Sequence, residues 1–194
     1  MKTSNTPIAS HITLAHHYWA TLLSPGDTVI DATCGNGHDT LALAKLVLKE
    51  GDGLLFGYDI QENAIAQTHL RLEKELPESI MKRVILLNAS HETFTFPGES
   101  LPPIRLIVYN LGYLPGDNKD ITTMTSTTLT SIQHAMEVLA VDGHISITCY
   151  PGHDEGSKEF LAMMEFVSKL PKESWACCHH QWVNKHDTAP SLLV

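Results

Sequence analysis

The chain of 194 residues has no long hydrophobic run and only four cysteines. Its longest apolar stretches, such as residues 41–48, are far shorter than the about 20 residues that cross a membrane. Residues 1–11 carry one lysine and no apolar core, so no signal peptide is expected. The cysteines form no Cys-x-x-Cys pair, which is typical of reduced thiols. We therefore expect a cytoplasmic protein with no membrane partner.

Basic residues are also scarce. The 13 Lys and Arg residues face 22 Asp and Glu residues, for a net charge of −9 at pH 7. This balance argues against sequence-independent binding to long DNA, which depends on neutralising phosphates. It leaves room for RNA, because a small basic patch can serve a compact target. The clustered basic candidates are Arg71, Lys74, Lys82, Arg83 and Lys119.

Metal-ligand spacing is missing as well. Residues 177–180 read Cys-Cys-His-His, but adjacent residues of a strand point to opposite faces and cannot share one ion. Structural zinc sites usually separate their ligands by two or more residues. No metal is expected.

What the sequence does contain is a regular alternation of apolar segments, with 43% hydrophobic residues overall. Strands and helices that alternate in this way predict a parallel sheet covered by helices, here as a single domain over residues 1–194. An amphipathic N-terminal helix is expected at about residues 8–23. The expected strands are 28–31, 54–58, 84–87, 104–109, 143–149, 175–183 and 191–194, and the other expected helices are 38–49, 61–75, 127–139 and 157–170.

The most informative motif is a glycine turn between the first of these strands and the next helix. It reads Asp31-Ala32-Thr33-Cys34-Gly35-Asn36-Gly37. Glycines let the backbone approach a ligand, and a helix N-terminus offers free N–H groups. A dinucleotide site would need a third glycine where Thr40 stands, and a P-loop would need Gly-Lys-Ser/Thr. The turn suits a nucleoside that carries a carboxylate, namely S-adenosylmethionine (SAM).

Two carboxylates fit this interpretation. Asp31 can accept from the ammonium group of SAM, and residues 35–37 can pass beneath the amino-acid chain. Asp59 ends the second strand and can hold both ribose hydroxyls. The alternative is an ordinary strand-to-helix turn in which Asp39 and Thr40 cap the helix.

Polar residues follow the third strand too. Ser90 can donate to a ring nitrogen of adenine, and His91 can stack on the ring. Alternatively, Ser90 only caps a turn.

The fourth strand runs into Asn110-Leu111-Gly112-Tyr113. The Asn110 side-chain carbonyl can orient an attacking amine, and the backbone carbonyls of Leu111 and Gly112 can take its second N–H. Tyr113 can stack on a flat base. The pattern is similar to the Asn-Pro-Pro-Tyr motif of methyltransferases that act on base amino groups. A turn with a core tyrosine is the structural alternative.

An alkyl amine has a pKa near that of lysine, about 10.4, so it is mostly protonated in water. Desolvation, with Asn110 or Asp31 as acceptor, could bind the amine and remove its proton. We therefore assign catalytic roles to Asp31, Asn110 and Tyr113.

Taken together, these motifs resemble the MnmM (YtqB-type) family, formerly called putative rRNA methylases. The likeness covers nearly the whole chain. It is carried by residues 31–33 and 35–40, Asp59-Ile60-Gln61, Ser90-His91, residues 110–116, Lys119, residues 121–123, Tyr150, Gly152-His153, Glu155-Gly156 and Asn184.

The resemblance implies a Rossmann-like class I SAM methyltransferase, with a mostly parallel seven-stranded sheet, helices on both faces and an antiparallel last strand. It implies methylation of the 5-aminomethyl group of 5-aminomethyl-2-thiouridine at the tRNA wobble position, giving 5-methylaminomethyl-2-thiouridine. The tRNA would be held by its anticodon arm, and a homodimer is plausible for a small enzyme.

The resemblance assigns Asn36, Asp59, Gln61, Ser90 and His91 to the cofactor, Asn110 and Tyr113 to the base, and Tyr150 and His153 to its rim. The motifs and the resemblance together give the full predicted sets. The cofactor set is Asp31, Thr33, Gly35, Asn36, Gly37, Asp59, Gln61, Ser90, His91 and Asn110. The substrate set is Leu111, Gly112, Tyr113, Lys119, Tyr150 and His153. The chain departs from the family pattern at Asp117-Asn118 and at Pro151, both in loops expected near RNA.

Other functions stay open at this point. A SAM enzyme for a small-molecule or protein amine, or for rRNA, would share the pocket. A non-catalytic SAM- or RNA-binding module would predict a broken loop at residues 110–113, and that loop is intact. Thr40 at the third-glycine position disfavours a nicotinamide dehydrogenase.

Overall fold

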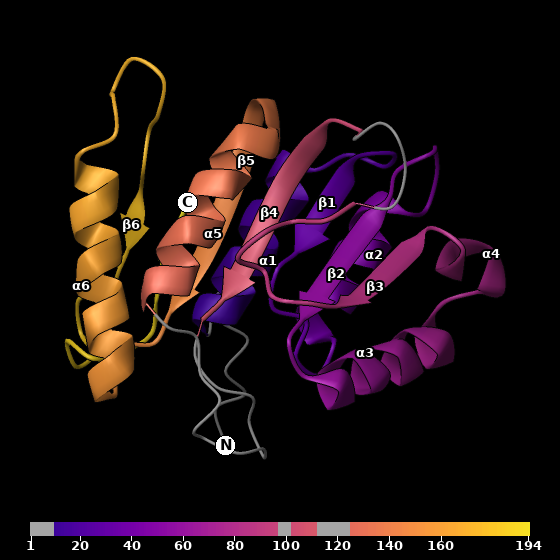
Figure 1. Ribbon diagram of the computed structural model, residues 1–194, viewed down its shortest axis with the longest axis horizontal. Helices are drawn as coiled ribbons and strands as arrows, with labels where there is room; N and C mark the ends of the chain where they lie inside the picture. The colour runs from indigo at the N-terminus through magenta and orange to yellow at the C-terminus, as the bar shows by residue number, and fades with distance from the viewer. Residues whose placement is uncertain (1–9, 97–101, 112–124) are drawn as a thin grey trace, which may run out of the picture.

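The computed structural model describes residues 10–96, 102–111 and 125–194 (Figure 1). The helices are α1 (His11–Leu22), α2 (His38–Val47), α3 (Glu62–Glu75), α4 (Glu78–Met81), α5 (Thr125–Val138) and α6 (Asp154–Ser168). The strands are β1 (Thr28–Asp31), β2 (Leu55–Asp59), β3 (Val84–Asn88), β4 (Ile104–Asn110), β5 (Leu139–Cys149), β6 (His179–His180) and β7 (Ser191–Leu193).

The strands form one seven-stranded sheet in the order β3-β2-β1-β4-β5-β7-β6. The first five positions pair in parallel, and β7 runs antiparallel to both β5 and β6. The prediction of a mostly parallel sheet with an antiparallel last strand is confirmed. The order reverses direction at β1 and β4, so the carboxyl ends of these two strands flank the crevice where such sheets bind ligands.

Alternate residues of the strands face two different apolar layers. Val29 packs with the far-side helices α1, α2 and α3, whereas its neighbour Ile30 packs with α5 and α6. Leu192 and Leu193 divide in the same way between the two layers. Figure 1 shows α5 in front of the sheet and α1 behind it. Burial on both faces explains why the strands are continuously apolar in sequence.

Helix α1 closes the far face across β5 and β7. Its N-cap Ser10 accepts a hydrogen bond from the Thr13 backbone N–H through its hydroxyl. Near the other end of the helix, Trp19 is 2% exposed and its indole Nε1 donates to the Ser146 hydroxyl at 2.9 Å. This buried bond fixes how α1 lies on the sheet, and therefore where the histidines of α1 lie.

The structure differs from the sequence predictions at several element ends. Helix α6 begins at Asp154, three residues earlier than expected, because His153 caps it. The strand expected at residues 175–183 is reduced to His179–His180, and β5 begins at Leu139 directly after α5. The short helix α4 was not predicted. Within the described ranges, no helix is long and apolar enough to cross a membrane.

We expect Trp19 to be a main anchor of α1. Trp19→Phe removes the indole donor and leaves the Ser146 hydroxyl buried without it, which should cost about 1–3 kcal/mol. Trp19→Ala adds a cavity and should cost about 3–5 kcal/mol in the free energy of unfolding. Urea unfolding followed by circular dichroism measures both. Leu161→Ala, at a side chain that is 64% exposed, is the control and should change stability little. Equal stability of all three variants would contradict this role of Trp19.

Candidate active site

The glycine turn lies at the carboxyl end of β1 and leads into α2. Gly35 and Gly37 have φ values of +52° and +76°, in the left-handed region that favours glycine. A Cβ on Gly37 would lie 2.9 Å from Cα and Oγ1 of Thr68 in α3. The glycines therefore allow both the sharp turn and the close packing of the turn against α3.

Asp59, at the end of β2, fixes the turn with its carboxylate. Its Oδ2 accepts from the Gly35 N–H and its Oδ1 accepts from the Gln61 N–H, each at 2.9 Å. Burial raises the pKa of Asp59, although these two hydrogen bonds oppose the shift. Each oxygen keeps a second lone pair, so the carboxylate can also accept from two ligand hydroxyls.

Asp31, at the end of β1, is almost completely buried. Its Oδ1 accepts from the Thr33 N–H at 3.1 Å, and its Oδ2 accepts from the Thr40 hydroxyl at 2.6 Å. Burial, and then the charge of Asp39, raise the pKa of Asp31 to about 7.

The N-cap of α2 is Gly37, and no side chain caps this helix. The alternative in which Asp39 and Thr40 cap α2 is therefore wrong.

Ser90 and His91 follow β3, as expected. Ser90 Oγ accepts from the Glu92 N–H at 3.1 Å, which is the turn contact considered as the structural alternative. The His91 ring meets Tyr109 edge to face, with centroids 5.8 Å apart. Its Nδ1 is buried and has no hydrogen-bond partner among the described residues. Burial lowers the pKa of His91 to about 4, so the ring is neutral at pH 7.

Asn110 ends β4 and is tied by one hydrogen bond to the glycine turn and by another to the first turn of α2. Its backbone N–H donates to Thr33 Oγ1 at 2.7 Å, and its Nδ2 donates to Asp39 Oδ2 at 2.9 Å. An amide that donates through nitrogen leaves its carbonyl oxygen as an acceptor. The structure therefore brings together the predicted amine acceptor and the predicted cofactor turn.

Asp39 lies between Asn110 and helix α1. Its Oδ1 is 2.7 Å from Nε2 of His16, while its Oδ2 accepts from Asn110. The side chain of Asp39 is only 13% exposed, against 33% for His16. The contact with His16 and the hydrogen bond from Asn110 thus hold one carboxylate from two sides.

Tyr150 follows β5 and completes the polar network. Its hydroxyl is 3.0 Å from Nε2 of His11, and the two rings meet edge to face. Burial and the charge of Asp39 raise the pKa of Tyr150 to about 12, while a side-chain hydrogen bond with Asn110 lowers it. The tyrosine is therefore a neutral hydroxyl beside the Asn110 amide.

The remaining predicted residues fall in different places. Leu111 is buried, and its N–H donates to the Thr148 carbonyl at 3.0 Å. His153 caps α6 by accepting from the Gly156 N–H at 3.1 Å. The carbonyl of Asn36 accepts from Nε of Arg71 at 2.6 Å. Gly112, Tyr113 and Lys119 lie outside the described residues.

Sequence reasoning missed His11, His16 and the role of Asp39. No spacing rule connects α1 with a turn more than 20 residues later, because the contact depends on how α1 packs across the sheet. A polar residue in the first turn of a helix is typical of a cap, and Asp39 was considered only in that role, as part of the structural alternative.

The comparisons with known proteins agree with this geometry. The family model described as "Putative rRNA methylase" matches residues 55–194, and a model described as "Methyltransferase domain" matches residues 23–83. The first match covers most of the chain. The chain belongs to this rRNA methylase family.

Individual family relatives span nearly the full length of the chain. A "putative rRNA-methylase" from Clostridium thermocellum is 33% identical, with a TM-score of 0.86 and 96% coverage of each chain. A "putative methyltransferase" from Streptococcus mutans, solved with SAH, is 31% identical, with a TM-score of 0.79 and coverage of 96% and 97%.

A curated relative from Arabidopsis thaliana, named "tRNA (mnm(5)s(2)U34)-methyltransferase, chloroplastic", is 39% identical over 93% of this chain. The present chain spans 66% of the length of that relative. The predictions of family, of a class I methyltransferase fold and of SAM as cofactor are confirmed.

The residues present fit SAM. The Asp59 carboxylate can accept hydrogen bonds from the ribose hydroxyls. The Nδ1 atom of His91 is buried without a partner among the described residues, so it can form a hydrogen bond with a ligand. The glycine turn offers backbone for the amino-acid portion, beside the carboxylate of Asp31. No group of three His, Cys, Asp or Glu side chains with metal-binding geometry occurs in the described part of the chain.

The raised pKa of Asp31 predicts a pH dependence of stability. The native carboxyl binds a proton up to about pH 7, whereas the unfolded one has a pKa of 3.8, so stability should fall as pH rises through this window. The lowered pKa of His91 acts in the opposite direction. Asp31→Asn isolates the first effect: its melting temperature relative to wild type should rise between pH 4 and pH 7. Parallel melting curves for the two proteins across this range would contradict the assignment.

Proposed function

We propose that the protein transfers a methyl group from SAM to the 5-aminomethyl group of 5-aminomethyl-2-thiouridine at the tRNA wobble position. The product is 5-methylaminomethyl-2-thiouridine. The observation that carries the proposal is the pair of hydrogen bonds that ties Asn110 to the glycine turn at 2.7 Å and to Asp39 of α2 at 2.9 Å. These bonds support a role for Asn110 as the amine acceptor beside the turn that we propose binds the cofactor. The name of the Arabidopsis relative supports the same substrate.

SAM supplies a methyl group on a sulfonium sulfur, which an amine accepts in an in-line displacement. The enzyme then has to present a neutral amine in the correct direction. The Asn110 carbonyl oxygen can accept a hydrogen bond from the amine because Asp39 occupies the other end of the amide. This contact directs the nitrogen lone pair away from Asn110. The buried surroundings disfavour the charged ammonium form.

Asp39 is a positioning residue in this scheme. Without it, the Asn110 amide can rotate and present N–H groups, which would repel the amine donor. His16 holds the far oxygen of Asp39, and Trp19 holds the helix that carries His16. A series of contacts that holds Asn110 in place therefore extends from the sheet to α1.

We also propose that the tRNA is gripped by its anticodon arm, that a homodimer supplies the additional surface, and that the enzyme works in the cytoplasm. The four cysteines are free, which supports a reducing compartment.

The assay that tests the proposal uses tRNA carrying 5-aminomethyl-2-thiouridine, with nucleoside mass spectrometry as the readout. The wild type should add one methyl group to this tRNA and none to an unmodified transcript. Asn110→Ala should lose methylation while largely keeping SAM affinity by calorimetry, because its role is to orient the amine. Equal loss of both would assign Asn110 to the cofactor instead. Methylation of rRNA or of a small amine, but not of the modified tRNA, would overturn the proposed substrate.

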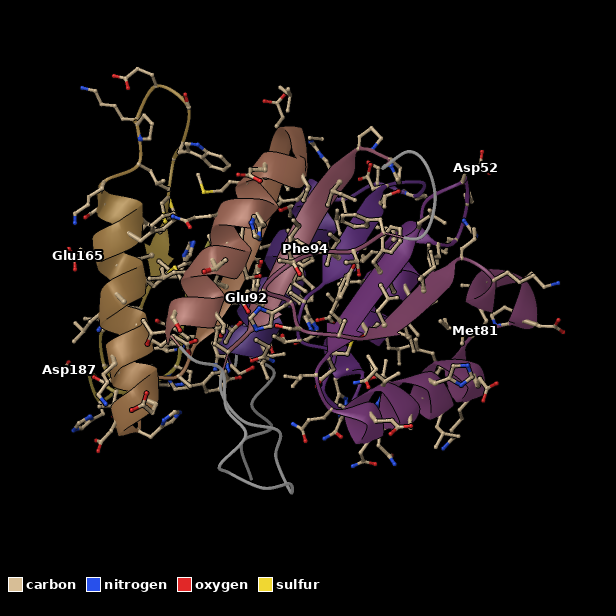
Figure 2. The ribbon with its side chains drawn as sticks, viewed as in Figure 1. Asp52, Met81, Glu92, Phe94, Glu165 and Asp187 are labelled. Atoms are coloured by element: carbon tan, nitrogen blue, oxygen red, sulfur yellow. The ribbon has the colours of Figure 1, made fainter. Side chains whose placement is uncertain are left out.

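Asp39→Ala should lower kcat about 100-fold, since a misplaced reacting group costs about that much. The KM for tRNA and the Kd for SAM should change far less. Asp39→Asn keeps one acceptor oxygen and should recover part of the lost kcat. Asp52→Ala, at an exposed aspartate at the opposite end of the sheet (Figure 2), is the matched control. A rise in KM with unchanged kcat would show that Asp39 binds the substrate and does not position Asn110.

A further inference from the structure

The loop of residues 181–190, here called the tail loop, connects β6 and β7. It lies at the end of the sheet where the parallel strands finish and the candidate site is located, here called the catalytic edge. The β6–β7 pairing of His180 with Leu192 anchors its two ends. A Cβ built on Gly152 would lie 3.5 Å from the Thr188 carbonyl oxygen, so the tail loop borders the segment that follows Tyr150. Figure 2 shows Asp187 beside the start of α6, at this same edge.

The tail loop presents a cation on an aromatic ring. Lys185 Nζ lies 4.3 Å from the ring centroid of Trp182, and the N–H of Lys185 donates to the Trp182 carbonyl at 3.3 Å. Lys185 is exposed, and its neighbour Val183 is fully exposed. Burial, and then the charge of Lys185, lower the pKa of His11, which contacts Tyr150. The contact of Thr188 with Gly152 joins the same loop to the segment that follows Tyr150.

Several other described cations are engaged elsewhere. Within the described ranges, Lys45, Lys82, Lys158 and Lys169 each lie within 4.0 Å of a carboxylate. Arg83, from the predicted basic cluster, donates to the carbonyls of Leu48 and Gly51 at the opposite end of the sheet. Asp187 forms no ion pair with Lys185 in this part of the chain.

These features select a partner that is anionic and has flat, unpaired rings. A phosphate can bind the ammonium, and a base can stack on the accessible part of the half-buried Trp182 indole, as in single-stranded nucleic-acid sites. We propose that the tail loop is an RNA-contacting surface, on which Lys185 binds a backbone phosphate and Trp182 stacks an unpaired base of the substrate tRNA. This inference rests on the proposed function and adds the part of the chain that grips the RNA.

The test measures the tRNA affinity of the full chain by fluorescence anisotropy at about 50 to 200 mM salt. Affinity that depends on phosphate contacts changes strongly over this range. Lys185→Gln should raise Kd several-fold and lower the slope of log Kd against log salt by about one, as expected for one lost phosphate contact. Trp182→Ala should raise Kd roughly tenfold, and Trp182→Phe should recover most of this loss. Both variants should raise KM for tRNA more than they lower kcat.

Two controls make the result specific. Lys172→Gln changes an exposed lysine beyond the end of α6, away from the catalytic edge, and should leave Kd and the salt slope unchanged. SAM affinity by calorimetry, together with melting temperatures, should be unchanged in all variants, because the tail loop is exposed. A Trp182→Ala protein that fails to fold leaves the decision to Lys185→Gln, which alters only a surface charge.

The failures of the two proposals can be told apart. A wild type that methylates the modified tRNA, with variants that bind it as tightly as wild type, would overturn the tail-loop inference alone. An equal effect of Lys172→Gln would also overturn it, because the contribution would then be general charge. A wild type that neither binds nor methylates tRNA would overturn the proposed function and this inference together.

Discussion

The carboxylate of Asp39 bonds to side chains from two other elements, and the order of the site depends on these two bonds. One oxygen meets His16 of α1 at 2.7 Å, and the other accepts from Asn110 at the end of β4 at 2.9 Å. A carboxylate that is only 13% exposed is costly unless it is paired. The cost of its burial is offset only when α1, α2 and β4 are all in place. Folding of α1 and formation of the site are therefore coupled.

Three aspartates share this small region, and their different environments separate their roles. Asp59 accepts from two backbone N–H groups, Asp31 from one backbone N–H and one hydroxyl, and Asp39 from side chains. Like charges at this spacing disfavour simultaneous ionisation, and burial adds to the effect. The raised pKa of Asp31 reflects both causes. A ligand cation at this turn would relieve the repulsion, so the three carboxylates favour a positively charged cofactor.

The sequence predicted the parts of the fold that depend on local pattern. Continuous apolar runs identified the central strands. The strand ends of a parallel sheet meet at one edge, and this rule predicted that Gly35, Gly37, Asp59 and Asn110 lie close together. Long-range contacts were not predictable in this way. The pairing of His16 with Asp39, and of His11 with Tyr150, depends on the docking of Trp19 against Ser146. Element ends were missed where a side chain unusual for the role, such as the His153 cap, decided the boundary.

The acidic composition also becomes understandable from the placement of charge. Half of the lysines in the described ranges lie within 4.0 Å of a carboxylate, whereas Lys185 lies on an aromatic ring beside the catalytic edge. A net charge of −9 repels polyanions over most of the surface, and this repulsion is screened beyond roughly 8 Å in physiological salt. A local cation can therefore act within that distance while the remaining surface discourages nonspecific RNA binding. The proposed specificity for one modified nucleotide would benefit from this arrangement, because an RNA that does not reach the active-site edge gains little from contact elsewhere.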